Sequence, residues 1–275
     1  MENAQSPPPD WFVKALAEEP ELGTTTVGGV AINHRSWGPA GAPDVVLVHG
    51  GVAHAQWWDH VAPLLIEGRR RVVALDLSGH GSSGRRTAYS IDRWAREVVD
   101  VAGGGRPVVV GHSMGGLVAL RAALHWGDRL AGTIAIDCRP VDFTPEEEAA
   151  NASRARTPLR VYPTREAALA RFRPVPEQWA LPYVRDQVAE TSVRRCAGGW
   201  TWKFDPRIFS GQDFDNTTFA RLSGRVLVVR AEHGISAVDT GLPSVEIPDA
   251  GHHVMLDRPL ALVSVLRTVL GLWER

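Results

Sequence analysis

A serine framed by glycines is the strongest chemical signal in the chain. The segment Gly111–Gly116 reads GHSMGG and holds Ser113 at its centre. It follows the apolar run Pro107–Val110 and precedes a helix-length segment, Met114–Trp126. A serine at such a strand-to-helix turn projects from a tight backbone, and the glycines keep other side chains away from it. We therefore predict that Ser113 is a nucleophile rather than a capping serine in a glycine-rich turn.

A second glycine-rich turn follows an earlier apolar run. His49-Gly50-Gly51 comes directly after Val45–Val48. A serine nucleophile needs preorganised N–H donors, because negative charge develops on the attacked carbonyl oxygen. The backbone N–H groups of Gly51 and of Met114, the residue after the serine, are the predicted donors. The alternative is a flexible strand-to-helix turn without a chemical role.

The third signal is a pair of histidines near the end of the chain. Asp249–His253 reads DAGHH and lies between the last apolar run and the last helix-length segment. A late histidine suits the chain order serine, acid, histidine. His252 directly follows Gly251 and is the predicted general base, whereas we expect His253 to face the protein or the solvent. The alternative is a pair of histidines in an ordinary turn.

The elements that position these residues follow from hydrophobic patterning. Four short apolar runs show no alternation, as expected for strands of a parallel sheet covered on both faces: Val45–Val48, Val72–Leu75, Val108–Val110 and Ile134–Ile136. Helix-length segments separate them, at Gln56–Glu67, Ile91–Val101 and Met114–Trp126. This alternation predicts a doubly wound, mostly parallel α/β sheet. A β-hairpin around Gly28-Gly29 precedes it.

The alternation stops near Arg139 and returns at Val226–Val229. The segment between them is rich in proline and contains short helical patterns at Pro145–Ala155 and Arg165–Phe172. We predict an inserted helical cap, residues 140–220, in a core domain made of residues 1–139 and 221–275.

Composition excludes several classes of function. The chain has 275 residues and a formal net charge of −1, which gives no reason to expect nucleic acid or an anionic membrane as a partner. Cys138 and Cys196 do not have metal-ligand spacing, and we expect no metal or organic cofactor. The first residues lack a secretory pattern, and no apolar stretch is long enough to cross a membrane. We expect a cytoplasmic enzyme of undetermined oligomeric state.

Four motifs together resemble the α/β-hydrolase fold superfamily: His49–Gly51, Asp76–Ser83, Gly111–Gly116 and Gly251-His252. They are most similar to its small, cofactor-free esterases and carbon–carbon hydrolases. The resemblance spans about residues 24–140 and 221–273, and the insertion is similar in position to the lid of that superfamily. It implies acyl transfer to water, with a small or medium apolar ester, or a ketone cleaved at a carbon–carbon bond, as substrate. The fold hosts many reactions, so the motifs are poor guides to the substrate.

The acid of the expected triad departs from the resembling pattern. The family usually places it in a segment like Gly-Glu-x-Asp, but Arg230–Ile235 reads RAEHGI here, with glycine at position 234. Glycine cannot orient an imidazole. We predict Asp137 at the end of Ile134–Ile136, because some members place their acid after this earlier strand, with Glu232 and Asp239 as alternatives. Without an acid, a lyase, acyltransferase or oxygenase on the same scaffold would be favoured. A non-enzymatic ligand-binding module is the second alternative, and intact Ser113 and His252 argue against it.

Aromatic residues mark the predicted substrate pocket. Trp200, Trp202 and Phe204 would share one face of an extended segment, and Trp57 and Trp58 follow the second glycine-rich turn. They either border the pocket or pack the cap onto the sheet. The arginines of the insertion could attract a carboxylate, but neighbouring acids balance them, so most are expected on a solvated face.

Overall fold

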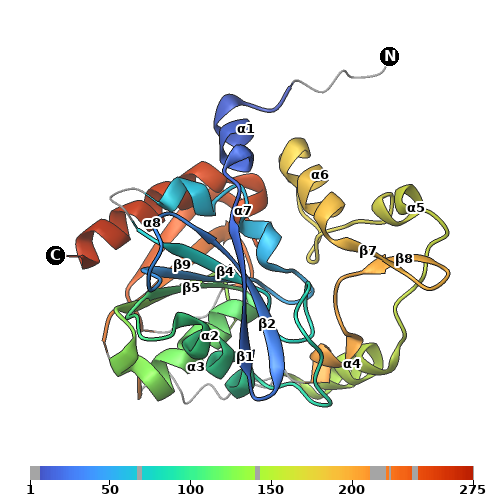
Figure 1. Cartoon of the computed structure of the whole chain (residues 1–275), viewed down its shortest axis with the longest axis horizontal. Helices are drawn as coiled ribbons and strands as arrows, with labels where there is room; N and C mark the ends of the chain where they lie inside the picture. Colours follow the sequence, from blue (N-terminus) through green and yellow to red (C-terminus); the bar gives the residue numbers. More distant parts are fainter. Residues whose placement is uncertain are drawn as a thin grey trace.

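The computed structural model describes residues 7–66, 70–139, 143–210, 221–222, 224–236 and 241–274. Its centre is one sheet in the strand order β1-β2-β4-β3-β5-β6-β9-β10 (Figure 1). The bounds are Glu21–Val27, Val30–Trp37, Val72–Leu75, Val45–Val48, Val108–His112, Gly132–Ile136, Val226–His233 and Ser244–Gly251, in that order. All pairs from β4 to β10 are parallel, and only β1 and β2 run antiparallel to their neighbours. The predicted mostly parallel sheet is confirmed.

Helices cover both faces of the sheet, as Figure 1 shows. One face packs against α2 (Ile91–Ala102) and α3 (Met114–Trp126). The other packs against α7 (Val254–Asp257) and α8 (Pro259–Trp273), with α1 (Asp10–Ala17) nearby. Side chains of one strand alternate between these two cores: in β3, Val45 and Leu47 belong to one core and Val46 and Val48 to the other. Burial on both faces explains why the central strands show no polar alternation.

Two local expectations have different outcomes. The hairpin is confirmed, because β1 pairs with β2 and both Gly28 and Gly29 have positive φ angles of 54° and 77°, the backbone that a two-residue hairpin turn needs. The predicted helix Gln56–Glu67 is wrong. Two short 3₁₀ segments stand there, η1 (Ala55–Trp58) and η2 (Ala62–Leu65), since Pro63 cannot donate within a continuous helix.

The chain between β6 and β9 is inserted at one side of the sheet (Figure 1). Its described part holds three helices, a hairpin and a 3₁₀ segment: α4 (Pro145–Arg156), α5 (Arg165–Leu169), α6 (Pro182–Thr191), β7 (Val193–Cys196), β8 (Gly199–Trp202) and η5 (Pro206–Ser210). The second predicted helical pattern, Arg165–Phe172, is therefore shorter than expected, because its helix ends at Leu169. In the described residues, no helix is long and apolar enough to cross a membrane.

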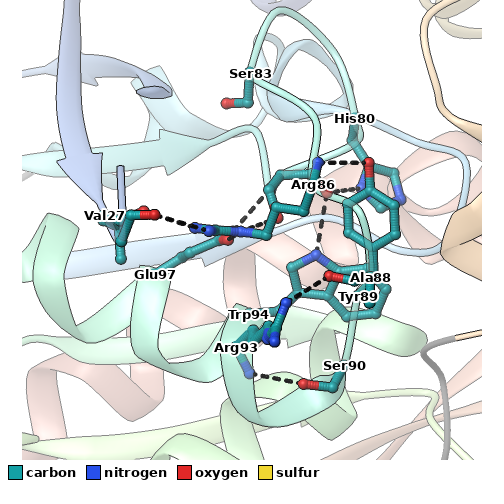
Figure 2. Close-up of polar contacts among 12 residues, drawn as sticks. Val27, His80, Ser83, Arg86, Ala88, Tyr89, Ser90, Arg93, Trp94 and Glu97 are labelled. Carbon is teal, nitrogen blue, oxygen red and sulfur yellow. Dashed lines mark hydrogen bonds and ion pairs between the residues drawn. The ribbon is translucent and has the colours of Figure 1, made fainter. Parts of the chain in front are cut away.

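The loop after β4 joins the inserted segment to the core and is held by buried polar groups. Glu97 of α2 accepts the Ser78 N–H at 2.8 Å and pairs with Arg86 at 2.9 Å, and the Trp94 indole donates to the Ser78 carbonyl (Figure 2). The Tyr89 hydroxyl donates to Asp205 of the insertion at 3.0 Å. This loop carries the Asp76–Ser83 motif, in which the Gly81 N–H donates to the Lys203 carbonyl at 2.7 Å and the Gly79 carbonyl accepts the Asp205 N–H at 2.8 Å, so the motif holds the end of the inserted segment against the core.

Candidate active site

Ser113 lies in the sharp turn between β5 and α3. Its φ of 54° is a left-handed conformation that a residue with a side chain adopts only under constraint. The constraint comes from close packing, because a Cβ on Gly111 would overlap the backbone of Gly115, and one on Gly115 would overlap the end of β3. The Ser113 N–H donates to the Ile136 carbonyl of β6 at 2.9 Å. The turn therefore holds the hydroxyl at the end of the sheet, half-exposed, at the start of a helix.

His252 stands between Ser113 and Asp137. Its Nε2 is 3.0 Å from Ser113 Oγ, and its Nδ1 is 2.7 Å from Asp137 Oδ2. The three residues follow β5, β6 and β10, whose ends meet at one edge of the sheet. The structure thus brings together the three residues that the sequence analysis ranked first for nucleophile, base and acid.

The surroundings of Asp137 fix the position of its carboxylate. The side chain is completely buried, and its oxygens accept backbone N–H groups of Ala231 at 3.3 Å, Ile235 at 2.9 Å and Ser236 at 3.3 Å. Its backbone has a φ of 39° and is fixed by an N–H donated to the Val229 carbonyl of β9. The carboxylate is therefore held in one place and turned toward His252.

The space beside Gly234, the position where an acid was expected, is filled by the Asp137 carboxylate. A Cβ built on this glycine would overlap the carboxylate of Asp137. The space that an acid after β9 would fill is thus occupied by an acid from β6. Glu232, the first alternative acid, does not contact His252: its side chain is exposed and accepts the Asp249 N–H at 2.7 Å. Asp239 lies outside the described residues.

Two further histidines pack around His252. The His112 and His253 rings lie 4.7 Å from the His252 ring, centroid to centroid. Burial lowers the pKa of His253 to about 3 and holds the pKa of His112 well below its ordinary value. Both rings therefore stay neutral at pH 7 and do not oppose a positive charge on His252. His253 is buried, and of the two expectations for it the one that faces the protein is correct.

A cap residue fixes the loop that carries His252. Gln178 accepts the His253 N–H at 2.7 Å and donates to Asp257 Oδ2 at 3.1 Å. The same carboxylate oxygen accepts the Gly251 N–H at 2.6 Å. The residues on both sides of His252 are thereby tied to one carboxylate and one amide, which limits the movement of the imidazole.

A cavity of about 610 Å³ opens in front of Ser113. Gly51 and Met114, the predicted oxyanion donors, line it together with His252. So do Trp57, Trp202 and Phe204 among the predicted pocket residues. The volume is in the range of small-molecule sites.

Two predicted pocket residues do not reach this cavity. Trp58 is completely buried in the core beneath the sheet edge, one position beyond Trp57 in the same 3₁₀ segment. Trp200 packs with Trp202 in the small core of the cap, but its ring lies beneath the Arg165 guanidinium instead of at the cavity. Sharing a strand face was therefore not sufficient to share the cavity.

Among the described residues, His112, His252 and His253 form a buried cluster of side chains that could bind a metal ion. One ring nitrogen of each lies within 4.8 Å of the others. Both ring nitrogens of His252 already contact Ser113 and Asp137. A metal bound there would displace the serine, so the group does not fit a resident metal that assists Ser113. An exposed second group joins Glu232, His233 and Asp249.

Several residues at this site were not found from the sequence. Gln178, Asp257, Phe172, Phe209 and four arginines described below have no motif around them. Only His112 had a local signal, since it lies within Gly111–Gly116; its Nε2 is 2.9 Å from the His252 carbonyl. The others depend on how the cap folds over the sheet.

Residues 45–265 match the alpha/beta hydrolase family. Esterase Rv0045c of Mycobacterium tuberculosis is 29% identical in an alignment that covers 91% of this chain and 89% of that protein. Its solved structure superposes with a TM-score of 0.69, at 24% identity, over 95% of this chain and 99% of that one. The structure of E-2-(acetamidomethylene)succinate hydrolase gives a TM-score of 0.77 at 20% identity, over 92% of this chain and 100% of that one.

Proposed function

The chain belongs to the alpha/beta hydrolase family, and from this premise we propose that it is a serine hydrolase that cleaves a small or medium ester with an apolar acyl group. Cleavage of a carbon–carbon bond next to a ketone is the related possibility for the same site. The observation that carries the proposal is the chain of contacts from Ser113 Oγ through His252 to Asp137, at 3.0 and 2.7 Å. Residues 140–220 act as the cap of a core formed by residues 1–139 and 221–275.

The reaction follows from the contacts. Ser113 Oγ attacks the carbonyl carbon while His252 Nε2 takes its proton. The negative oxygen of the tetrahedral intermediate accepts hydrogen bonds from the backbone N–H groups of Gly51 and Met114. His252 returns the proton to the leaving alcohol, and water then attacks the acyl-enzyme by the same route. Asp137 fixes the Nδ1–H tautomer of His252 and stabilises the imidazolium.

An acid at His252 also bears on the alternatives. Glycine at position 234 was the reason to consider a lyase, acyltransferase or oxygenase, and intact Ser113 and His252 argue against a non-enzymatic ligand-binding module. Asp137 removes that reason, because it offers the carboxylate that Gly234 cannot.

Labelling with a fluorophosphonate probe tests the mechanism. The wild-type protein should label and hydrolyse at least one p-nitrophenyl ester in a series of acyl lengths. Ser113→Ala should not label, and its turnover should fall by about 10⁶-fold, the scale seen when a triad serine is removed. Wild-type-like turnover in this variant would exclude the acyl-enzyme.

A further inference from the structure

The charges around the cavity have one sign. In the part of the chain that the structure describes, four arginines and no aspartate or glutamate line the space in front of Ser113: Arg139, Arg154, Arg171 and Arg173. The whole chain has one more acidic than basic residue, so this bias is not a consequence of composition. Both neighbouring histidines are neutral, and the hydrolysis proposed above uses none of the arginines.

Three of the four arginines have no carboxylate partner among the described residues. Only Arg139 forms an ion pair, with Glu147 of α4 at 2.5 Å. Arg173 donates to two neutral acceptors, the carbonyls of Phe172 at 2.6 Å and of Ala170 at 3.3 Å.

Arg154 donates to the Asn151 side chain at 3.4 Å, and Arg171 has no ion pair within the part of the chain that the structure describes. Elsewhere in the cap, arginines do pair with acids: Arg165 with Glu190, Arg185 with Asp186 and Arg207 with Asp205. Among the described residues, no acid therefore pairs with Arg154, Arg171 or Arg173, although all three are exposed, as expected for a solvated face.

The positive groups stand beside an aromatic wall. Phe172, between Arg171 and Arg173 in sequence, contacts Trp57 and Trp202 with ring centroids 6.3 and 6.2 Å apart. The guanidinium of Arg154 lies over the Phe209 ring at 5.6 Å. All four of these aromatic side chains line the cavity. The cavity lining thus combines an apolar aromatic wall with a cationic rim, formed by the exposed side chains of Arg154, Arg171 and Arg173.

We propose that the substrate is an ester whose acyl chain carries a carboxylate at the end remote from the scissile carbonyl. This inference rests on the proposed function. The apolar part of the chain would lie against the aromatic wall, and the carboxylate would meet the rim formed by Arg154, Arg171 and Arg173. Guanidinium matches carboxylate in charge and planar geometry. A cleft of one sign also concentrates ligands of the opposite sign before they bind.

The side chains of Arg154, Arg171 and Arg173 are all exposed, which sets the size of the effect. A single exposed ion pair contributes little, but several cations around one anion add to each other. We expect a preference of about tenfold, which weakens as salt screens the charges.

Matched esters measure this preference. The monomethyl esters of straight-chain dicarboxylic acids from succinate to suberate are compared with methyl esters of fatty acids of similar chain length. At low salt, kcat/KM should be about tenfold higher for the anionic ester at one or more lengths. The ratio should fall toward one in about 0.5 M NaCl.

Arginine variants locate the effect. Arg171→Gln and Arg154→Gln should lower the ratio of anionic to neutral kcat/KM several-fold. Arg185→Gln is the matched control, because Arg185 is a cap arginine that pairs with Asp186 and does not line this cavity, so it should leave the ratio unchanged. Equal kcat/KM for anionic and neutral esters at every length, or a ratio insensitive to Arg171 and Arg154, would overturn the proposal.

A binding measurement separates this proposal from the proposed function. Ser113→Ala is titrated with the same esters while tryptophan fluorescence is followed, since Trp57 and Trp202 line the cavity. Tighter binding of the anionic esters supports the cationic rim even if no ester is hydrolysed. Equal or weaker binding counts against it whether or not the enzyme hydrolyses esters.

Discussion

The carboxyl edge of the sheet and the cap line the same cavity but differ in how deeply their residues are buried. At the sheet edge, the neighbouring strands β3, β5 and β6 are buried at every position, and each ends in a residue or turn of the site. In the cap, α4 has no buried residue, and α6 buries only Val184, Val188 and Ala189. The edge supplies the proposed reacting groups, whereas the proposed cap supplies much of the aromatic wall and most of the charge.

This difference teaches where chemistry and selectivity are encoded. A reacting group at a strand end is positioned by dense packing and by backbone hydrogen bonds that tolerate little change. A cap residue on an exposed helix or a short hairpin can change without loss of the core. Substitutions at the edge should therefore reduce the rate for every substrate, whereas substitutions in the cap should change which substrate is preferred.

The largest expected effect at the edge comes from Asp137→Asn. The change keeps the shape of the side chain but removes the charge that stabilises the His252 imidazolium. By analogy with the effect of the same substitution in serine proteases, kcat should fall by about 10⁴-fold. Glu232→Gln is the control, because Glu232 contacts Asp249 instead of His252, and its rate should stay close to that of the wild type. If the Glu232 variant loses more activity, Asp137 is not the acid.

The contrast also describes what the sequence could predict. Ser113 and His252 lie in short motifs whose turn geometry is local, so residue types and spacing were sufficient to find them. Asp137 was predicted only through the resemblance, because some members of the superfamily place their acid after the strand that adjoins the nucleophile strand. Period and alternation predicted a doubly wound, mostly parallel α/β sheet, and the four motifs identified it as similar to the α/β-hydrolase fold.

The parts that were missed depend on packing between segments distant in sequence. Gln178 reaches the His252 loop from 74 positions away, and no motif marks it. Trp58 and Trp200 have the same residue type as Trp57 and Trp202, yet only the latter two reach the cavity. Residue type alone did not distinguish the wall of a pocket from the core behind it.

Gly234→Ala should produce the next largest effect. The added methyl group would overlap the Asp137 carboxylate, so this carboxylate must shift away from its contact with His252. A displacement of about 1 Å at a reacting group can cost about 10²-fold, and we expect kcat/KM to fall by this order. Overpacking should also lower the free energy of unfolding by about 1–3 kcal/mol.

Gly271→Ala is the control for this change. Gly271 lies in α8 with no atom within 4 Å of a built Cβ. Alanine there should leave the rate unchanged and stabilise the helix slightly. A rate loss in both variants, or in neither, would contradict the role given to the space beside Asp137.

Trp202→Ala tests the cap side of the comparison. Trp202 lines the cavity and contacts Phe172, whereas Trp200 lies in the same strand away from the cavity. Removing the indole of Trp202 should enlarge the site, so that the preferred acyl chain becomes longer by a few carbons in the p-nitrophenyl ester series. Trp200→Ala should lower stability to a similar extent without changing the preferred length. Unchanged selectivity with a large drop in melting temperature for both variants would show that these residues only pack the cap.

The smallest expected effect concerns Asp257, where the cap meets the loop that carries His252. Burial raises the pKa of Asp257 to about 6, above the value near 3.9 expected in an unfolded chain. Between about pH 4 and 6 the folded state therefore holds a proton that the unfolded chain has released. The free energy of unfolding falls as pH rises through this window, and the contribution of the protonated form is complete only below it.

Asp257→Asn cannot titrate, but it keeps an oxygen for the Gly251 and Gln178 N–H groups. Its unfolding free energy, measured by urea denaturation from pH 4 to 7, should decline less steeply with pH than that of the wild type. The two slopes should differ by the equivalent of less than about one bound proton. Asp59, whose pKa burial also raises to about 6, remains in this variant, so the decline should become shallower and not vanish. The exposed Asp186→Asn should leave the slope unchanged. An identical slope in the Asp257 variant would mean that Asp257 does not bind a proton in the folded state between about pH 4 and 6. The contact between Gln178 and Asp257 would then contribute no pH dependence to the stability of the protein.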